Sequence, residues 1–256
     1  MAFSPEYRTY PRASAATTAA VLDAGLRAYM LRVYNWMTSG LLLTGIVAYV
    51  IAHTGLIDAF YPMVQTPMGP AHHATGLAML AMFAPLGFVL VLSFGVNKLS
   101  TTAVQALFWL FCAAMGASLT SIFLIYTDAS IVRVFFITAA TFAAMSIYGY
   151  TTKTDLTRFG SFLMMGLIGI IIASVVNMFV GSTALQFAVS VIGVLVFTGL
   201  TAFDTQRIKA SYVQYAYAEG VELAGKRSVF DALSLYLNFI NLFMLLLQIM
   251  GNRNSN

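Results

Sequence analysis

Seven long apolar stretches, separated by short polar segments, follow one another along the 256-residue chain. Each is close to the roughly 20 apolar residues that a helix needs to cross a bilayer, and none shows the alternation of a barrel strand. The approximate spans are residues 34–52, 74–96, 101–126, 131–150, 159–180, 184–203 and 229–250. We therefore predict an all-α polytopic membrane protein with seven transmembrane helices, since lipid obliges a spanning segment to satisfy its own backbone hydrogen bonds.

The composition leaves little sequence for a soluble domain. Charged residues make up 9% of the chain and hydrophobic residues 60%, whereas a soluble domain usually carries about 25% charged residues. We expect a polar N-terminal arm at residues 1–33, a membrane domain at residues 34–251 and a short tail at residues 252–256. Apolar side chains recur in the arm near helical spacing, at Val21, Leu22, Leu26, Tyr29, Met30 and Val33. The arm therefore forms either a short amphipathic helix on the membrane surface or an extension of the first span.

Lys and Arg residues are distributed unevenly between the two sides of the predicted membrane. Only Arg133 and Arg253 lie on the side of the C-terminus, and the other 11 of the 13 lie in the arm or after the second, fourth and sixth spans. Because Lys and Arg favour the cytoplasmic side, we predict a cytoplasmic N-terminus and a C-terminus outside. The net charge of +4 then reflects topology and contact with the lipid bilayer, and the basic residues form no clustered face for nucleic acid.

Polar residues enter the predicted spans mainly near the last two. Asp204 and Asp231 are the only acidic residues that touch a span, and each lies at its cytoplasmic edge. Polar side chains in the last span follow a period of 3.5 residues, and this polar seam consists of Asp231, Ser234, Asn238, Asn241 and Gln248. A seam of this kind is costly against lipid and should face protein or a water-filled cavity. The last span is therefore predicted to be an inner helix.

Each of these polar residues also has a simpler structural interpretation. Asp231 follows Ser228 with the spacing of a capping box, which would place it at the start of the last helix. Asn238 and Asn241 would serve as interhelical hydrogen-bond partners. Asp204 would be a solvated carboxylate paired with Arg207, three positions further along the helix.

The sequence argues against an enzyme and against a retinal protein. All four lysines fall in predicted loops, no H-E-x-x-H motif occurs, and no predicted span contains a histidine that could relay protons. No catalytic residue is predicted, and no cofactor is expected other than calcium as a permeant or bound ion.

Three motifs together resemble the Bax inhibitor-1 family, the transmembrane Bax inhibitor motif proteins, in its bacterial branch. The motifs are "VYNWMTSGLLLTG" from residue 33, "FDTQRI" from residue 203 and "LYLNFINLF" from residue 235, and the likeness extends from about Arg32 to Gly251. The resemblance implies location in a bacterial inner membrane and a seventh helix enclosed by the other six. It also implies a latch of two aspartates, one in each of the last two helices, that responds to protons and controls a calcium leak.

This sequence departs from the family's latch at one position. Asp204 matches the first aspartate and is the candidate ligand for calcium, but Asn238 occupies the second position. Two carboxylates in contact share a proton, whereas an Asp–Asn pair can form a hydrogen bond at any pH. Asp231, seven residues before Asn238, is the remaining candidate for a second acid. Two hypotheses follow: a cation leak with a pH gate at Asp204, Asn238 and Asp231, or a non-conducting modulator that binds a membrane protein such as a quality-control protease.

Overall fold

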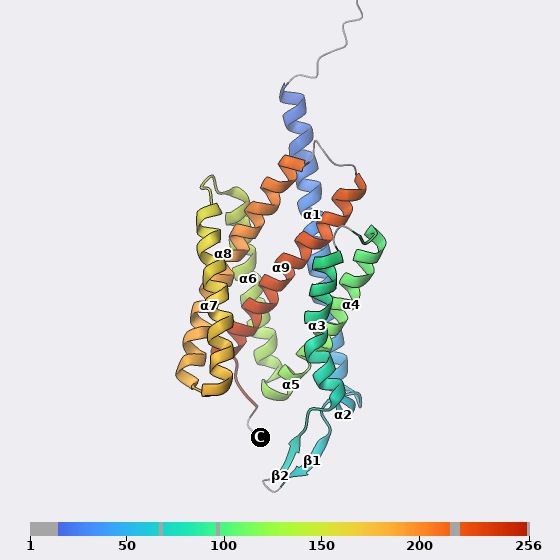
Figure 1. Cartoon of the computed structure of the whole chain (residues 1–256), viewed down its shortest axis with the longest axis vertical. Helices are drawn as coiled ribbons and strands as arrows, with labels where there is room; N and C mark the ends of the chain where they lie inside the picture. Colours follow the sequence, from blue (N-terminus) through green and yellow to red (C-terminus); the bar gives the residue numbers. More distant parts are fainter. Residues whose placement is uncertain (1–14, 67–68, 96–97, 216–220, 255–256) are drawn as a thin grey trace, which may run out of the picture.

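The computed structural model describes residues 15–66, 69–95, 98–215 and 221–254, which form a bundle of long helices (Figure 1). Seven helical segments of this described part are long and apolar enough to cross a membrane. The long helices are α1 (Ala15–His53), α3 (Gly76–Gly95), α4 (Thr101–Leu119) with α5 (Ser121–Ile125), α6 (Asp128–Thr151), α7 (Thr157–Val180), α8 (Thr183–Tyr215) and α9 (Val221–Met250). The predicted fold class, an all-α membrane protein with seven spans, is confirmed.

Several of the helices begin or end at local capping signals. The hydroxyl oxygens of Ser100 and Thr127 accept hydrogen bonds from backbone N–H groups at the starts of α4 and α6, as N-cap residues do. Gly181 ends α7 in the left-handed conformation, with φ of 64°, which glycine adopts without steric cost. These short-range signals set the helix lengths within the membrane.

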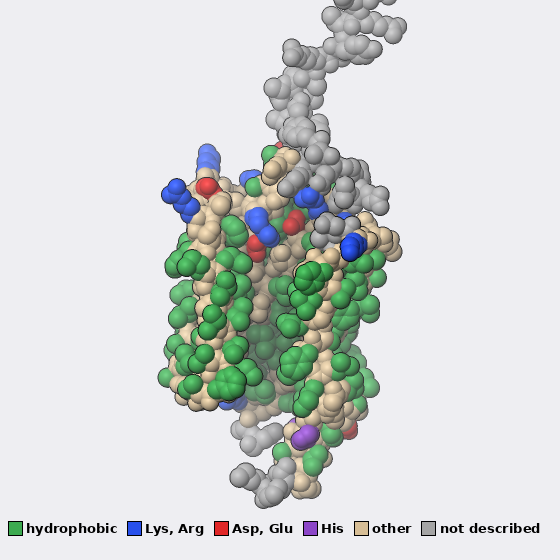
Figure 2. All heavy atoms as spheres, viewed as in Figure 1, with side chains coloured by type: hydrophobic (Ala, Val, Ile, Leu, Met, Phe, Trp, Pro, Cys, Tyr) green, Lys and Arg blue, Asp and Glu red, His purple; other side chains and the backbone are tan. Residues whose placement is uncertain are grey.

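A small hairpin lies at one end of the bundle, which we call the hairpin end. The strands β1 (Met63–Thr66) and β2 (Gly69–His72) pair antiparallel and follow the short helix α2 (Ile57–Phe60). The hairpin was not predicted from the sequence. At the opposite end α6 and α8 terminate and α7 and α9 begin, and Figure 2 shows Lys and Arg side chains gathered there, so we call it the basic end.

The last helix, α9, is the most buried of the seven spans. In its apolar window 61% of the residues are buried, compared with 6% in α7. Its main packing partners are α1, α4, α6 and α8, while α3 packs on α4 and α7 packs on α8. In Figure 1, α9 runs obliquely between these outer pairs. The helix is therefore an inner helix, but its enclosure by all six others is not confirmed.

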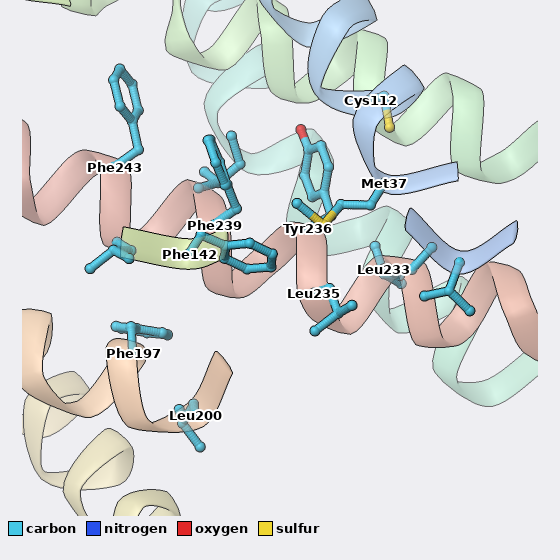
Figure 3. Packing of buried hydrophobic residues seen from close by; sticks show 14 of the residues in the cluster. Met37, Cys112, Phe142, Phe197, Leu200, Leu233, Leu235, Tyr236, Phe239 and Phe243 are labelled. Carbon is cyan, nitrogen blue, oxygen red and sulfur yellow. The ribbon is translucent and has the colours of Figure 1, made fainter. Parts of the chain in front are cut away.

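The centre of the core is a set of aromatic side chains around α9. Tyr236 is fully buried, packs edge-on against Phe108 and Phe111 of α4 and points toward α1 and α4 (Figure 3). Its hydroxyl lies 2.7 Å from that of Thr44, which itself donates to the carbonyl of Cys112. The buried hydroxyls therefore have partners, as buried polar groups require.

The structure shows how the described parts of the arm and the tail are attached to the bundle. The helix α1 runs without interruption from Ala15 in the arm into the first span, and the apolar face formed by Leu26, Tyr29, Met30 and Val33 belongs to the protein core. Of the two alternatives for the arm, the structure therefore shows an extension of the first span. The side chains of residues 21 and 22, which belonged to the predicted apolar face, lie outside the described part. The tail is anchored, since the Asn252 carbonyl accepts from Thr127 N–H and Asn254 N–H donates to the carbonyl of Ile125.

Candidate functional site

Asp204 lies inside the continuous helix α8. The helix α8 extends 12 residues beyond Phe203, to Tyr215, so it continues well past the apolar run that Phe203 ends. Its side chain is 14% exposed. One carboxylate oxygen accepts a hydrogen bond of 2.7 Å from the Asn238 amide, and the other lies 3.0 Å from the guanidinium of Arg207. The contact with α9 and the ion pair within α8 are therefore present together.

The residues around Asp204 hold this part of α8 in a fixed position. Gln206 accepts a hydrogen bond from the N–H of Leu156 and donates to the carbonyl of Thr154, both in the α6–α7 loop. Lys209 donates to the carbonyl of Tyr150 at the end of α6. One side of α8 is thus fastened to α6 and its loop, which leaves Asp204 facing α9.

Asp155, in the same α6–α7 loop, carries a charge that is insensitive to mildly acidic pH. It accepts hydrogen bonds from the hydroxyl and the backbone N–H of Thr157. These hydrogen bonds favour the carboxylate and lower the pKa of Asp155 from its usual value. A response of the protein between about pH 5 and 8 therefore does not originate at Asp155.

Asp231 is not the helix cap that its spacing from Ser228 suggested. The helix α9 begins at Val221, before both residues, and the Ser228 hydroxyl donates to the carbonyl of Gly225. Asp231 instead accepts a hydrogen bond of 2.6 Å from the hydroxyl of Tyr29 on α1. The guanidinium groups of Arg207 and Arg227 also interact with it electrostatically. Asp231 therefore links α9 to α1.

The other members of the polar seam have different surroundings. The Ser234 hydroxyl donates within α9 to the carbonyl of Phe230. Gln248 reaches α8, where its side-chain oxygen accepts from the hydroxyl of Ser190. Asn241 is exposed, and its amide donates to the carbonyl of Leu237 in its own helix. The structure thus gives Asn238 the predicted interhelical hydrogen bond but gives Asn241 none.

Five residues at the basic end make up what we call the polar cluster, and it joins α1, α8 and α9. Its members are Tyr29, Asp204, Arg207, Asp231 and Asn238. Tyr29 was not among the residues predicted for the site, because it fitted the apolar pattern of the arm. A tyrosine differs from the other residues of this apolar face because its hydroxyl needs a hydrogen-bond partner when it is buried. The hydroxyl of Tyr29 was therefore the one feature of the sequence that could have indicated a polar contact here.

The polar cluster contains few ligands for a resident metal ion. Among the described residues, no group of three or more His, Cys, Asp or Glu side chains could hold one. Calcium usually takes six to eight oxygen ligands, whereas the cluster supplies the carboxylates of Asp204 and Asp231 and few further side-chain oxygens, such as the amide oxygen of Asn238. The arrangement fits a transient cation contact or a hydrogen-bonded latch better than a metal cage.

Comparison with known proteins gives a consistent family relationship. The family described as "Inhibitor of apoptosis-promoting Bax1" matches residues 26–255. The chain is 47% identical over 230 residues to "Inner membrane protein YbhL" of Escherichia coli K12, covering 90% of this chain and 94% of that protein. It is also 47% identical over 233 residues to "Uncharacterized protein RP147" of Rickettsia prowazekii, covering 91% and 93%. A protein of Caulobacter vibrioides is 44% identical over 236 residues, covering 91% and 92%.

Proposed function

From the premise that this integral membrane protein belongs to the Bax inhibitor-1 family, we propose that it is a pH-sensitive cation leak. Calcium is the proposed permeant ion, and the polar cluster is the proposed gate. The observation that carries the proposal is the position of Asp204, a largely buried carboxylate that joins α8 to α9 through Asn238. Charged side chains this close to a membrane-spanning core are costly and are usually retained for function.

The hydrogen bonds of the polar cluster suggest how a gate would close. The Asp204–Asn238 contact holds α8 to α9, and the Tyr29–Asp231 contact holds α1 to α9. Both carboxylates act as acceptors, and hydrogen bonds to charged groups are stronger than neutral ones. Protonation of Asp204 would remove the charge that Arg207 and Asn238 contact. We therefore propose that acidification weakens the closed arrangement and increases the leak.

The charge distribution supports a cytoplasmic basic end. The described Lys and Arg residues at that end include Lys98, Lys153, Arg158, Lys209 and Lys226, whereas Arg133 and Arg253 lie toward the hairpin end. The bias of Lys and Arg toward the cytoplasm would then place the gate on the cytoplasmic side and the C-terminus outside. The similarity to a protein named as an inner membrane protein supports location in a bacterial inner membrane.

A non-conducting modulator is the second candidate function. The helix α7 packs mainly on α8, and most of its apolar surface is exposed along the span. Its glycine Gly169 has open space around it, and small residues allow close approach of another helix in a membrane. A membrane protein partner such as a quality-control protease would bind at this face without any need for the charge of Asp204.

Purified protein in liposomes that contain a calcium indicator tests the proposal. The leak hypothesis predicts calcium entry that depends on the protein and increases as the external pH falls from 8 to 5. Empty liposomes provide the background, and liposomes with a protein of the same size but no channel provide a control for disturbance of the bilayer. Entry no faster than these controls at every pH would reject the leak and favour the modulator.

A further inference from the structure

A cavity of about 900 Å³ lies between α1 and α6, away from the polar cluster. Its walls are α1 from Tyr34 to Val50 and α6 from Ile131 to Ser146, and side chains of α9 such as Phe239 form its floor. Figure 3 shows Phe142 of α6 lying against Phe239 at this floor. No residue of the polar cluster lines this α1–α6 cavity.

The lining of the α1–α6 cavity is almost entirely apolar, and its length suits a lipid chain. The α1 wall between Tyr34 and Val50 corresponds to ~24 Å at the helical rise of ~1.5 Å per residue. This length covers most of a hydrocarbon core of about 30 Å. An extended acyl chain therefore matches both the length and the apolar lining of the cavity.

One buried hydroxyl of the cavity lining has no hydrogen-bond partner among the described residues. Ser146 is 6% exposed and lines the cavity, and its oxygen forms no hydrogen bond among the described residues. The threonines of α6 behave differently, because Thr138, Thr141 and Thr151 each donate to the carbonyl four residues earlier. Buried hydroxyls normally have a partner. An acceptor on a ligand in the cavity would provide one for Ser146.

The depth of Ser146 in the membrane matches the ester groups of a phospholipid. It lies five residues before Thr151, the last residue of α6, which is ~7.5 Å along the helix axis. With 24 residues, α6 is ~36 Å long and exceeds a core of about 30 Å. Ser146 therefore lies just inside the edge of the hydrocarbon core at the basic end, close to the level of lipid ester carbonyls.

A cation lies one helical turn beyond Ser146. Tyr150 shares a face of α6 with Ser146 because they are four residues apart, and the ammonium of Lys209 donates to the Tyr150 carbonyl and lies 4.8 Å from its ring centroid. An ammonium carries three donors, so Lys209 retains N–H groups for a second acceptor. A phosphate at the headgroup level would complement this charge.

We propose that the α1–α6 cavity binds one phospholipid of the leaflet at the basic end. One acyl chain lies between α1 and α6, an ester carbonyl accepts a hydrogen bond from the Ser146 hydroxyl, and the phosphate lies near Lys209. The site goes beyond the proposed leak and does not depend on it. Such a lipid would fill a lateral opening next to α9 and stay with the protein when the surrounding lipids exchange.

Two glycines give a matched pair of variants for the test. Gly45 lines the cavity and Gly169 lies on the exposed face of α7, and an added Cβ would meet no atom within 4 Å at either position. Gly45→Phe should place a ring in the cavity, whereas Gly169→Phe should point into the surrounding lipid. Each full-length protein is washed extensively in mild detergent, and the phospholipid retained per chain is measured by lipid extraction and native mass spectrometry. Wild type and Gly169→Phe should retain one phospholipid, and Gly45→Phe should retain almost none.

The roles of the Ser146 hydroxyl and the Lys209 ammonium are tested on protein that keeps Gly45, so that the cavity remains open. Dioleoyl phosphatidylglycerol and dioleoylglycerol, which lacks the phosphate, are added back to delipidated protein. Ser146→Ala should weaken binding of both lipids by about threefold to tenfold, the effect of one net hydrogen bond. Wild type should prefer the lipid with the phosphate, and Lys209→Met should reduce that preference.

Three results would overturn the proposal. Equal lipid retention by Gly45→Phe and Gly169→Phe would show that the lipid lies elsewhere. Unchanged affinity in Ser146→Ala would remove the hydrogen bond on which the assignment rests. A dimer that Gly45→Phe alone dissociates, with no retained lipid in wild type, would identify the occupant as a second copy of the chain. None of these outcomes depends on whether the protein conducts ions, so a failure here differs from a failure of the leak.

Discussion

Asp204 on α8 accepts a hydrogen bond of 2.7 Å from the side-chain amide of Asn238 on α9, across a sequence separation of 34 residues. The amide is a donor whose charge does not change with pH, so only the Asp204 side of this contact titrates. The family resemblance implies two aspartates at the corresponding positions. The contact in this chain is therefore a hydrogen bond from a neutral amide to a carboxylate, in place of a proton shared between two acids.

The first prediction concerns the pH dependence of calcium entry in liposomes. Asp204→Asn removes the titrating group of this contact and should leave entry insensitive to pH between about 5 and 8. Asn238→Asp creates two carboxylates in contact, which cannot both ionise without strong repulsion. Entry through Asn238→Asp should therefore depend on pH more steeply than entry through the natural protein.

Two other outcomes would contradict the gate at Asp204. Three superimposable pH curves would place the leak elsewhere, because both substitutions change the number of carboxylates in the contact. Equal and protein-independent signals from all three proteins would indicate that the chain does not conduct. The substitutions keep similar side-chain volumes, so a change in packing is a poor explanation for a difference in pH dependence alone.

The second prediction concerns the link between α1 and α9. Tyr29→Phe removes the hydroxyl that donates to Asp231 at 2.6 Å and keeps the buried ring. Because hydrogen bonds to charged groups contribute about 1.5 to 3 kcal/mol, thermal stability in detergent should fall clearly. Tyr34→Phe, on the same helix, is the control, since the Tyr34 hydroxyl forms no hydrogen bond with the described residues. In a double-mutant cycle, Tyr29→Phe should cost much less when Asp231 is already Leu, which has no acceptor for the Tyr29 hydroxyl.

The third prediction compares the two asparagines of the polar seam. Asn238→Leu should destabilise the protein by about 1.5 to 3 kcal/mol, since it removes a hydrogen bond to a charged and largely buried carboxylate. Asn241→Leu should change stability by less than about 0.5 kcal/mol, because its amide contacts only the carbonyl of Leu237 and is exposed. Unfolding in mild detergent measures both. A larger loss in Asn241→Leu than in Asn238→Leu would contradict the arrangement of α8 and α9.

The fourth prediction concerns the close approach of α6 and α8. A Cβ added at Gly149 would overlap the backbone carbonyl of Ala202, which has no flexible end that could move aside. Gly149→Ala should therefore destabilise the protein by about 1 to 3 kcal/mol. At Gly169 on α7 the added methyl meets open space, so Gly169→Ala should be neutral or stabilising by up to about 1 kcal/mol. Equal stabilities of these two variants would place α6 and α8 further apart.

The fifth prediction concerns the orientation in the membrane. A reporter enzyme that is active only outside the cytoplasm should give a signal when fused after Arg253 and none when inserted in the α6–α7 loop. A reporter that is active only in the cytoplasm should give the reverse. Signals of the opposite sign would move the polar cluster to the outer side and would remove the proposed cytoplasmic gate.

The sequence by itself determined the number and type of the spans. Helix formation in a membrane depends on local features, namely the length of an apolar run and the hydrogen bonds that each segment forms within itself. It also indicated that the last helix lies inside, because a row of polar residues such as Asn238 and Gln248 is costly against lipid. Both features follow from the order of residues along one helix.

The tertiary structure alone decided which polar groups meet. Asp231 and Tyr29 are 202 residues apart, and no spacing within one helix predicts that contact. Asn238 and Asn241 belong to the same seam, yet they differ by about 60° around a helix of 3.6 residues per turn, which is enough to move an amide from a neighbouring helix to an exposed surface. The apolar runs also underestimate the lengths of two helices, since α8 ends at Tyr215 and α9 begins at Val221, before the predicted cap at Ser228. Both helices continue past those runs because they pack on each other and on α1, and helix stability in proteins comes mainly from such packing.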